Sequence, residues 1–137
     1  MNYDYVLDSY AWSEFFDGTN QGITVKEILD NHLVATSVIA LAELSDKFSR
    51  EQRDFQPLAM LIQTKVAVIP LTSRVAIQAG NLKQELRKIA KNISLADAIH
   101  FQTAKDLNAI FVTGDPDFKE VKEGVLFLEE SSREENA

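Results

Sequence analysis

The sequence contains no cysteine and only two histidines, His32 and His100. Without cysteine there is no disulfide framework and no thiolate zinc site, and two histidines are too few for a zinc site built from imidazoles. No apolar stretch reaches the ~18 residues that a membrane span needs, and the N-terminus lacks a basic region followed by a long apolar segment. We therefore expect a soluble, cytoplasmic protein that does not enter a membrane.

Basic residues are also in deficit, since 14 Lys and Arg stand against 21 Asp and Glu, for a net charge of −7. This balance argues against tight binding of nucleic acid by the whole surface, because phosphate neutralisation requires clustered cations. It leaves room for a local basic face, or for a metal ion that brings positive charge to a site. Part of the acid excess lies in residues 129–137, which we expect to be a frayed tail. Residues 1–128 are expected to form one domain.

Short apolar runs alternate with stretches of helical periodicity along the chain. Strands are predicted over 3–8, 33–36, 65–70, 109–113 and 125–128, and helices over 9–17, 24–33, 38–48, 55–64, 73–89 and 95–107. This alternation predicts βαβ units and a parallel sheet with helices on both faces. The first strand suits the centre of the sheet, because its aromatic and β-branched residues are typical of a strand covered on both sides.

Capping residues mark several of the helix starts. Thr24-x-x-Glu27 and Ser94-x-x-Asp97 have the pattern of a capping box, in which two side chains satisfy the free N–H groups of the first turn. Thr72 is expected to cap the long helix before its apolar stripe begins. These positions fix where three of the predicted helices should begin.

Four carboxylates are expected at one edge of the sheet. Asp8 and Asp115 directly follow apolar strands, whereas Glu43 and Asp97 lie in helices that follow such strands. Ligands of open α/β sheets gather at the carboxyl ends of strands, so all four acids can project over one edge. Clustered carboxylate oxygens suit Mg²⁺ or Mn²⁺, and such ions meet substrate phosphates through their remaining coordination positions. Phosphodiester hydrolysis is the reaction class that this arrangement indicates.

Each acid also has a structural explanation. Asp8, Asp97 and Asp115 can serve as helix or turn caps, a common role for aspartate. Glu43 is harder to explain in this way, because a carboxylate amid apolar neighbours is rarely buried without a partner. His100 follows Asp97 by three residues on the same predicted helix, and we interpret it as a hydrogen-bonded structural histidine rather than a metal ligand.

Four runs of the sequence resemble PIN domains in order and spacing, and they are most similar to the toxin ribonucleases of VapBC-type toxin–antitoxin pairs. The runs are 6–12, 37–44, 95–100 and 111–118. The resemblance covers about residues 3–128. It implies a three-layer α/β/α sandwich with a central parallel sheet of about five strands, and a Mg²⁺- or Mn²⁺-dependent endoribonuclease with an acidic pocket.

The resemblance also assigns roles to individual residues. The residues that match the four acids of the family are Asp8, Glu43, Asp97 and Asp115. Ser9 and Thr113 match hydroxyl positions beside the first and the fourth acid, and Asp117 either supplements or replaces Asp115 as a ligand. Toxins of this type usually form homodimers and are silenced by an antitoxin segment that enters the groove beside the acids. An antitoxin and an RNA substrate are therefore the expected partners.

The alternatives concern RNA binding and the reaction itself. Lys83, Arg87 and Lys91 recur every four residues along the predicted long helix, and this basic stripe is either an RNA contact or a solvated helix face. An aspartyl-nucleophile phosphatase commonly has a second Asp two positions after the first, where this chain has Tyr10. Two other functions stay open: another metal-dependent phosphoryl hydrolase, such as a DNA-directed nuclease, and a catalytically weak PIN-like module that binds RNA or protein.

Overall fold

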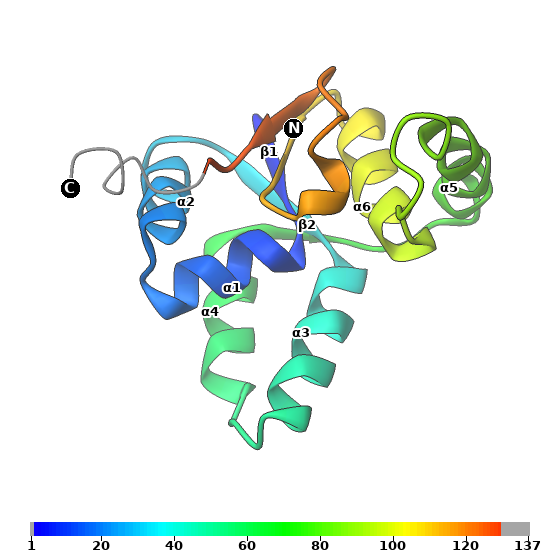
Figure 1. The fold of residues 1–137 in the computed structure, drawn as a ribbon. Helices are drawn as coiled ribbons and strands as arrows, with labels where there is room; N and C mark the ends of the chain where they lie inside the picture. The colour runs from blue at the N-terminus through cyan, green and yellow to red at the C-terminus, as the bar shows by residue number, and fades with distance from the viewer. Residues whose placement is uncertain (1, 130–137) are drawn as a thin grey trace.

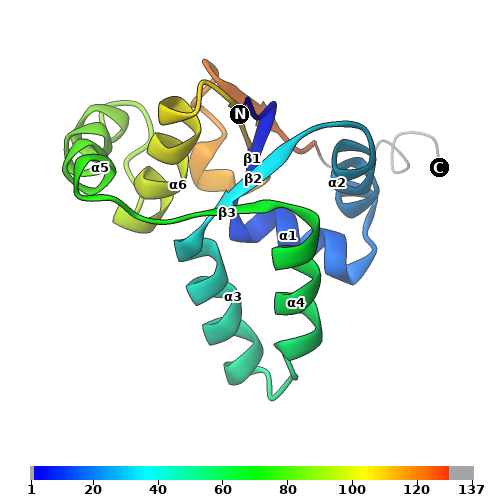
Figure 2. The ribbon, with the colours of Figure 1, turned by 180° about the vertical axis from the view of Figure 1, so that it is seen from behind.

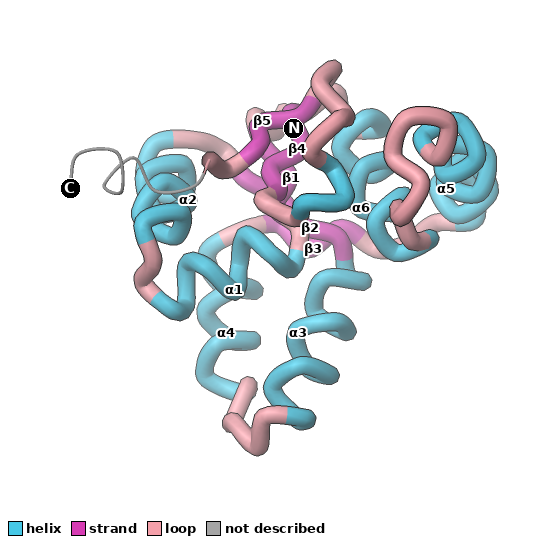
Figure 3. Tube along the Cα trace, in the orientation of Figure 1, coloured by secondary structure: helices cyan, strands magenta, loops and turns pink. Residues whose placement is uncertain are grey.

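Five parallel strands form the central sheet of the computed structural model, which describes residues 2–129 (Figure 3). The strands are β1 (Tyr5–Leu7), β2 (Val34–Ser37), β3 (Ala67–Ile69), β4 (Ile110–Thr113) and β5 (Val125–Phe127). Their order is β3-β2-β1-β4-β5, so the first strand is central, as the sequence predicts. The predicted tail, 129–137, lies outside the described residues apart from Glu129.

Helices cover both faces of this sheet and complete the expected three-layer sandwich (Figure 1). They are α1 (Ser9–Asp17), α2 (Asn20–Asn31), α3 (Val38–Arg50), α4 (Gln56–Lys65), α5 (Ser73–Leu86) and α6 (Leu95–Asp106), with a short 3₁₀ helix η1 (Pro116–Phe118) after β4. Helices α5 and α6 lie against one face, and α1, α2 and α4 lie against the other. The far ends of α3 and α4 extend beyond the sheet, as the reverse view shows (Figure 2).

The two faces of the sheet carry separate apolar cores. Val6 and Phe111 pack into the core beneath α5 and α6, whereas their neighbours Leu7 and Val112 pack into the core on the opposite face. This alternation follows from the period of two along a strand. All four side chains are fully buried, which explains why β1 and β4 are continuous apolar runs in the sequence.

The order of the strands places the carboxyl ends of β1 and β4 side by side. From β1 the chain moves outward to β2 and β3, and it then returns through α5 and α6 to β4 on the other side of β1. The two strands are paired in parallel, with Leu7 opposite Val112. The residues that follow them, Asp8 and Gly114, therefore stand at the switch point, where open α/β sheets bind ligands.

Helix α2 begins earlier than the sequence predicts. Its cap is Thr19, whose side chain accepts a hydrogen bond from the backbone N–H of Gly22, and Thr24 lies inside the helix. The predicted Thr24 capping box is thus wrong. The reason is that Gly18 adopts a left-handed conformation with φ of 66° and ends α1, so the next helix starts immediately. A side chain at Gly22 would meet the carbonyl oxygen of Glu14, so glycine allows α1 and α2 to approach closely.

Helix α5 ends at Leu86, before the predicted end at Ile89. The backbone of Arg87 caps the helix, Ile89 is 58% exposed, and Lys91 lies in the following turn. The predicted row of three basic residues on one helix is therefore wrong, because only Lys83 belongs to it. The chain leaves the helical path because the next apolar contacts are made by Ala90 and Ile93, which are buried in the core beneath α6.

The start of α6 agrees with the sequence. The Ser94 hydroxyl accepts a hydrogen bond from the Asp97 backbone N–H at 3.1 Å, and the Asp97 carboxylate accepts one from the Ser94 N–H at 3.0 Å. Both bonds of the predicted capping box are present. Among the helices of residues 2–129, none is long and apolar enough to cross a membrane.

Candidate metal centre

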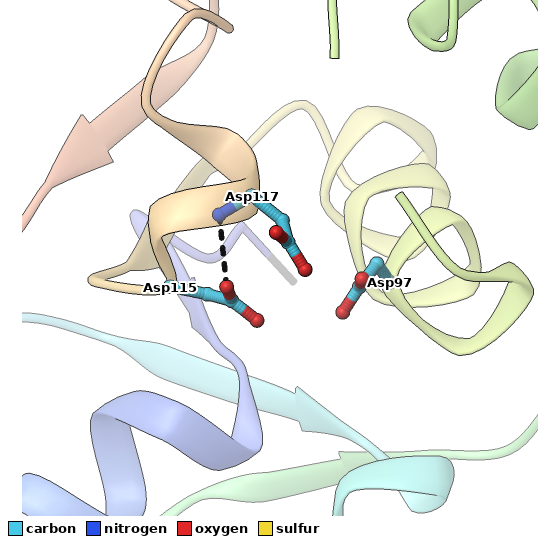
Figure 4. Close-up of side chains that lie close together, drawn as sticks. All are labelled: Asp97, Asp115 and Asp117. Carbon is cyan, nitrogen blue, oxygen red and sulfur yellow. Dashed lines mark hydrogen bonds between the residues drawn. The ribbon is translucent and has the colours of Figure 1, made fainter. Parts of the chain in front are cut away.

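Three carboxylates converge beyond the carboxyl ends of the strands (Figure 4). Asp97 lies in the first turn of α6, Asp115 caps η1, and Asp117 lies within η1. One carboxylate oxygen from each lies within 4.8 Å of the others, and all three residues are partly buried. Oxygen-only donors at this spacing suit a hard cation such as Mg²⁺ or Mn²⁺. The two acids between which the sequence left a choice, Asp115 and Asp117, are both in the group.

Backbone hydrogen bonds orient two of these carboxylates. Oδ1 of Asp115 accepts from the Asp117 N–H at 2.9 Å, and the Asp115 N–H donates to the Thr113 hydroxyl at 3.1 Å. Oδ2 of Asp97 accepts from the Ser94 N–H. Each of these bonds occupies one carboxylate oxygen and leaves the second oxygen free. Asp97 and Asp115 can therefore act as caps and still belong to the group of three carboxylates.

Burial and the neighbouring carboxylates both act on the pKa of Asp115. Burial raises the pKa of the Asp115 carboxyl, the hydrogen bond from the Asp117 backbone opposes the rise, and the charges of Asp97, Asp117 and Glu43 add to it. Repulsion among carboxylates has this effect when no cation lies among them. A divalent cation would relieve the repulsion, which is a physical reason to regard the residues as a fitting ligand set.

Asp8 lies beside the group but is not one of its three members. Its side chain is 3% exposed and caps α1 by accepting from the Ala11 N–H at 2.8 Å. Burial raises the pKa of Asp8 from 3.8 to about 7, against hydrogen bonds from Thr113 and Ala11 and the charge of His100, with a smaller upward contribution from Asp97. Asp8 is thus a buried acid in electrostatic contact with the cluster, and it holds its proton to a higher pH than an ordinary aspartate does.

Glu43 approaches the site from α3 and has two hydrogen-bond donors. Oε1 lies 3.0 Å from the Ser9 hydroxyl and 2.5 Å from Nε2 of His100. Burial by itself raises the pKa of Glu43, but the hydrogen bonds from His100 and Ser9 and the His100 charge outweigh it, so the pKa is lowered. The partner that a half-buried glutamate requires is therefore His100, and the prediction that this histidine is hydrogen-bonded is confirmed.

A pocket of about 360 Å³ extends from these acids between α1 and α3. Glu43 and Asp115 line it at the acidic end, together with Ser9. Lys47 and Arg50 of α3 line it as well, and Arg50 forms an ion pair with Asp46 at 3.1 Å. Neither cation was a candidate in the sequence, although Lys47 lies one turn after Glu43 on α3. The pocket that both cations line forms only where α3 packs against α1.

Tyr10 is a third residue that the sequence did not single out for the site. An added Cβ at Gly114 would lie 2.4 Å from the Tyr10 ring, so the glycine before Asp115 allows the ring to pack against the end of β4. The Tyr10 hydroxyl donates to Oε1 of Gln21 at 2.9 Å, and the Gln21 amide donates to the carbonyls of Leu128 and Glu129. Tyr10 thereby links α1 to α2 and to the end of β5.

The chain is an α/β/α sandwich with acidic side chains at its switch point, and its sequence matches the model of one protein family. The PIN domain model matches residues 5–124, and the chain belongs to the PIN-domain family. The resemblance stated from the four sequence runs is confirmed. A search of curated protein sequences finds no significant match.

The solved structures that resemble the chain include toxin–antitoxin proteins. A toxin–antitoxin complex from Klebsiella pneumoniae is 21% identical with a TM-score of 0.74, over 93% of this chain and 100% of that one. VapC20 of Mycobacterium tuberculosis, a toxin that cleaves the sarcin–ricin loop, is 21% identical with a TM-score of 0.66, over 84% and 92%. DNA-bound VapBC from Salmonella typhimurium is 16% identical with a TM-score of 0.68, over 93% and 97%. At these identities the likeness establishes a shared fold.

Proposed function

We propose that the protein is an endoribonuclease that hydrolyses RNA phosphodiesters with the help of Mg²⁺ or Mn²⁺. The observation that carries this proposal is the convergence of Asp97, Asp115 and Asp117 within 4.8 Å at the switch point of a PIN fold. Asp8 and Glu43 interact electrostatically with the same group, because the charge of Asp97 raises the pKa of Asp8 and the charge of Glu43 raises the pKa of Asp115. The similarity of the fold to that of an RNA-cleaving toxin supports RNA as the substrate.

The residues divide into ligands and supports. Asp97, Asp115 and Asp117 would hold the cation, Glu43 would be a further ligand on the side of the pocket, and Asp8 would complete the acidic site. When bound, such a cation polarises a phosphoryl oxygen of the substrate and makes a water molecule a stronger nucleophile. Ser9 donates to Glu43, and Thr113 accepts from the backbone of Asp115, so the two hydroxyls fix acids in place rather than contact the substrate.

RNA must approach an acidic protein, and Lys47 and Arg50 are the basic residues that line the pocket beside the acids. Lys83, Arg87 and Lys91 are the other candidates for RNA binding. Lys47→Glu should weaken RNA binding at low salt and flatten its dependence on salt, because one fewer phosphate is neutralised. Arg87→Glu is the matched variant outside the pocket. A larger loss of RNA affinity in Arg87→Glu than in Lys47→Glu would indicate that RNA binds beside the end of α5.

The reaction is tested by incubating the protein and Mn²⁺ with labelled RNA, single-stranded DNA and a phosphomonoester. We expect cleavage of RNA alone, with loss of activity in Asp8→Asn and Asp97→Asn and normal activity in Asp30→Asn, an exposed aspartate of α2. Cleavage of DNA would indicate a DNA-directed nuclease, and turnover of the phosphomonoester would indicate a phosphatase. No cleavage of any substrate would favour a binding module, and cleavage without a metal would contradict the proposal.

We further propose that the protein is the toxin of a toxin–antitoxin pair, acts in the cytoplasm and forms a homodimer. The support is that similar folds occur in the toxin–antitoxin complex of Klebsiella pneumoniae and in VapBC of Salmonella typhimurium. Induced expression should arrest bacterial growth, and the product of an adjacent small gene should restore it. Growth arrest by Asp97→Asn, or a monomer in light scattering, would contradict the corresponding part of this proposal.

A further inference from the structure

His100 has a buried nitrogen without a partner. Among residues 2–129, its Nδ1 is the only buried side-chain nitrogen or oxygen that makes no hydrogen bond. The ring lies in α6 and is 1% exposed. An unpaired polar atom in a dry interior loses its hydration without compensation, so an apolar side chain of the same size would be less costly there. The reason for a histidine must therefore lie in its other nitrogen.

That other nitrogen is a hydrogen-bond donor to Glu43. Nε2 lies 2.5 Å from Oε1 of Glu43, and an ionised carboxylate can only accept, so the proton must be on Nε2. Nδ1 takes no part in this contact, so the strong contact of the ring is directed entirely at Glu43.

Two donors act on the same oxygen of Glu43. The Ser9 hydroxyl from α1 and the His100 ring from α6 both bond to Oε1, at 3.0 and 2.5 Å. No hydrogen bond from residues 2–129 falls on Oε2. The side chain of Glu43 is 34% exposed and lines the pocket together with Asp115. The carboxylate is thus fixed by donors from two helices, and one oxygen is left for the pocket.

We propose that His100 is a positioning residue that, together with Ser9, restricts Glu43 to a contact through one oxygen and so favours Mg²⁺ and Mn²⁺ over Ca²⁺. The inference depends on the proposed metal-dependent function. Ca²⁺ takes more ligands at longer distances and readily accepts both oxygens of a carboxylate, whereas Mg²⁺ requires an octahedral shell that includes several waters. Because Ser9 and His100 both bond to Oε1, only Oε2 would be free to contact a cation, and this would remove the two-oxygen mode that Ca²⁺ readily accepts.

The test measures the affinity of the metal-free protein for Mn²⁺ by electron paramagnetic resonance, and for Ca²⁺ by competition. The variants are His100→Gln, His100→Asn and His100→Leu. Glutamine carries an amide donor to about the reach of Nε2, asparagine carries the same amide one methylene short, and leucine has no donor. We expect Asn and Leu to weaken Mn²⁺ binding by about 10- to 100-fold, as other losses of a ligand's hydrogen-bond partner do, and to reduce the preference for Mn²⁺ over Ca²⁺. Gln should retain both.

Several controls separate positioning from a purely structural role. Ser9→Ala should shift the Mn²⁺/Ca²⁺ ratio in the same direction, and His100→Leu should have no further effect in a Glu43→Gln background. Unchanged Mn²⁺ affinity and an unchanged ratio in folded His100→Asn and His100→Leu would overturn the inference. If His100→Leu does not fold, the comparison of Asn with Gln decides.

The proposed function fails in a different way. Wild-type protein that binds no Mn²⁺, or binds it as well after Asp97→Asn, would overturn the metal site, and this inference with it. Wild-type binding that requires Asp97 but ignores His100 would overturn the inference alone.

Discussion

Asp8→Asn should stabilise the metal-free protein, and by much more at pH 8 than at pH 5. Burial raises the pKa of Asp8 from 3.8 to about 7, so the folded protein retains a proton that the unfolded chain releases above about pH 4. Stability is therefore lost as the pH rises from about 4 to about 7. At about 1.36 kcal/mol per pKa unit, the loss amounts to roughly 4 kcal/mol.

Asparagine removes this pH dependence and preserves the other role of the residue. It cannot ionise, and it is as good an N-cap as aspartate, so its carbonyl can still accept from the Ala11 N–H that Asp8 binds at 2.8 Å. The variant should therefore match the wild type below about pH 4, exceed it by roughly 1.5 kcal/mol at pH 5 and exceed it by roughly 4 kcal/mol at pH 8. Other acids titrate in both proteins and cancel in the difference.

Urea denaturation with EDTA at pH 5 and pH 8 measures the effect directly. The expected result is a midpoint for Asp8→Asn that lies slightly above the wild-type midpoint at pH 5 and well above it at pH 8. A difference between the two proteins that is the same at both pH values would refute the reasoning, because it would mean that Asp8 keeps an ordinary pKa in the folded state. Saturating Mn²⁺ should narrow the gap at pH 8, since a cation favours the charged carboxylate of the wild type.

Three further substitutions test the packing around the site by thermal denaturation. Gly114→Ala should cost about 1–3 kcal/mol, because its Cβ would lie 2.4 Å from the Tyr10 ring; wild-type stability would contradict that contact. Gly80→Ala is the matched control, since nothing lies within 4 Å of the new Cβ in α5, and it should stabilise the protein by up to about 1 kcal/mol. Thr36→Val should cost about 1–3 kcal/mol by leaving the indole N–H of Trp12 and a β1 carbonyl without their partner; a neutral effect would mean that water replaces the hydroxyl.

Element order and type were predictable because local chemistry decides them in this chain. The cap of α6 depends only on Ser94 and Asp97, which lie in one turn. The start of α2 was not predictable in the same way, because Thr19 and Thr24 are both acceptable caps. The choice depends on the left-handed turn at Gly18 and on close packing against α1, and that packing is a tertiary effect.

That Asp8 and Asp115 lie at the same edge was predictable from topology, since the carboxyl ends of neighbouring parallel strands share one edge. The proximity of Asp97 to Asp115 depends also on helix packing, because α6 follows α5 and not a strand. The contact between His100 and Glu43 joins residues 57 positions apart and depends on how α6 and α3 pack. Lys47 lies one turn after Glu43, which the sequence already contains, but its place in a pocket depends on how α1 packs against α3. The sequence therefore directed attention to the basic residues from Lys83 onward instead.

The most direct test of the account is the effect of Mn²⁺ on thermal stability. A ligand at 100 times its dissociation constant stabilises the folded state by about 2.7 kcal/mol. Millimolar Mn²⁺ should therefore raise the melting temperature of the wild type and of Asp30→Asn by the same amount, and that of Asp97→Asn by much less. Equal shifts in all three proteins would mean that the acids at the switch point do not hold the cation, and the proposed ribonuclease mechanism would be wrong.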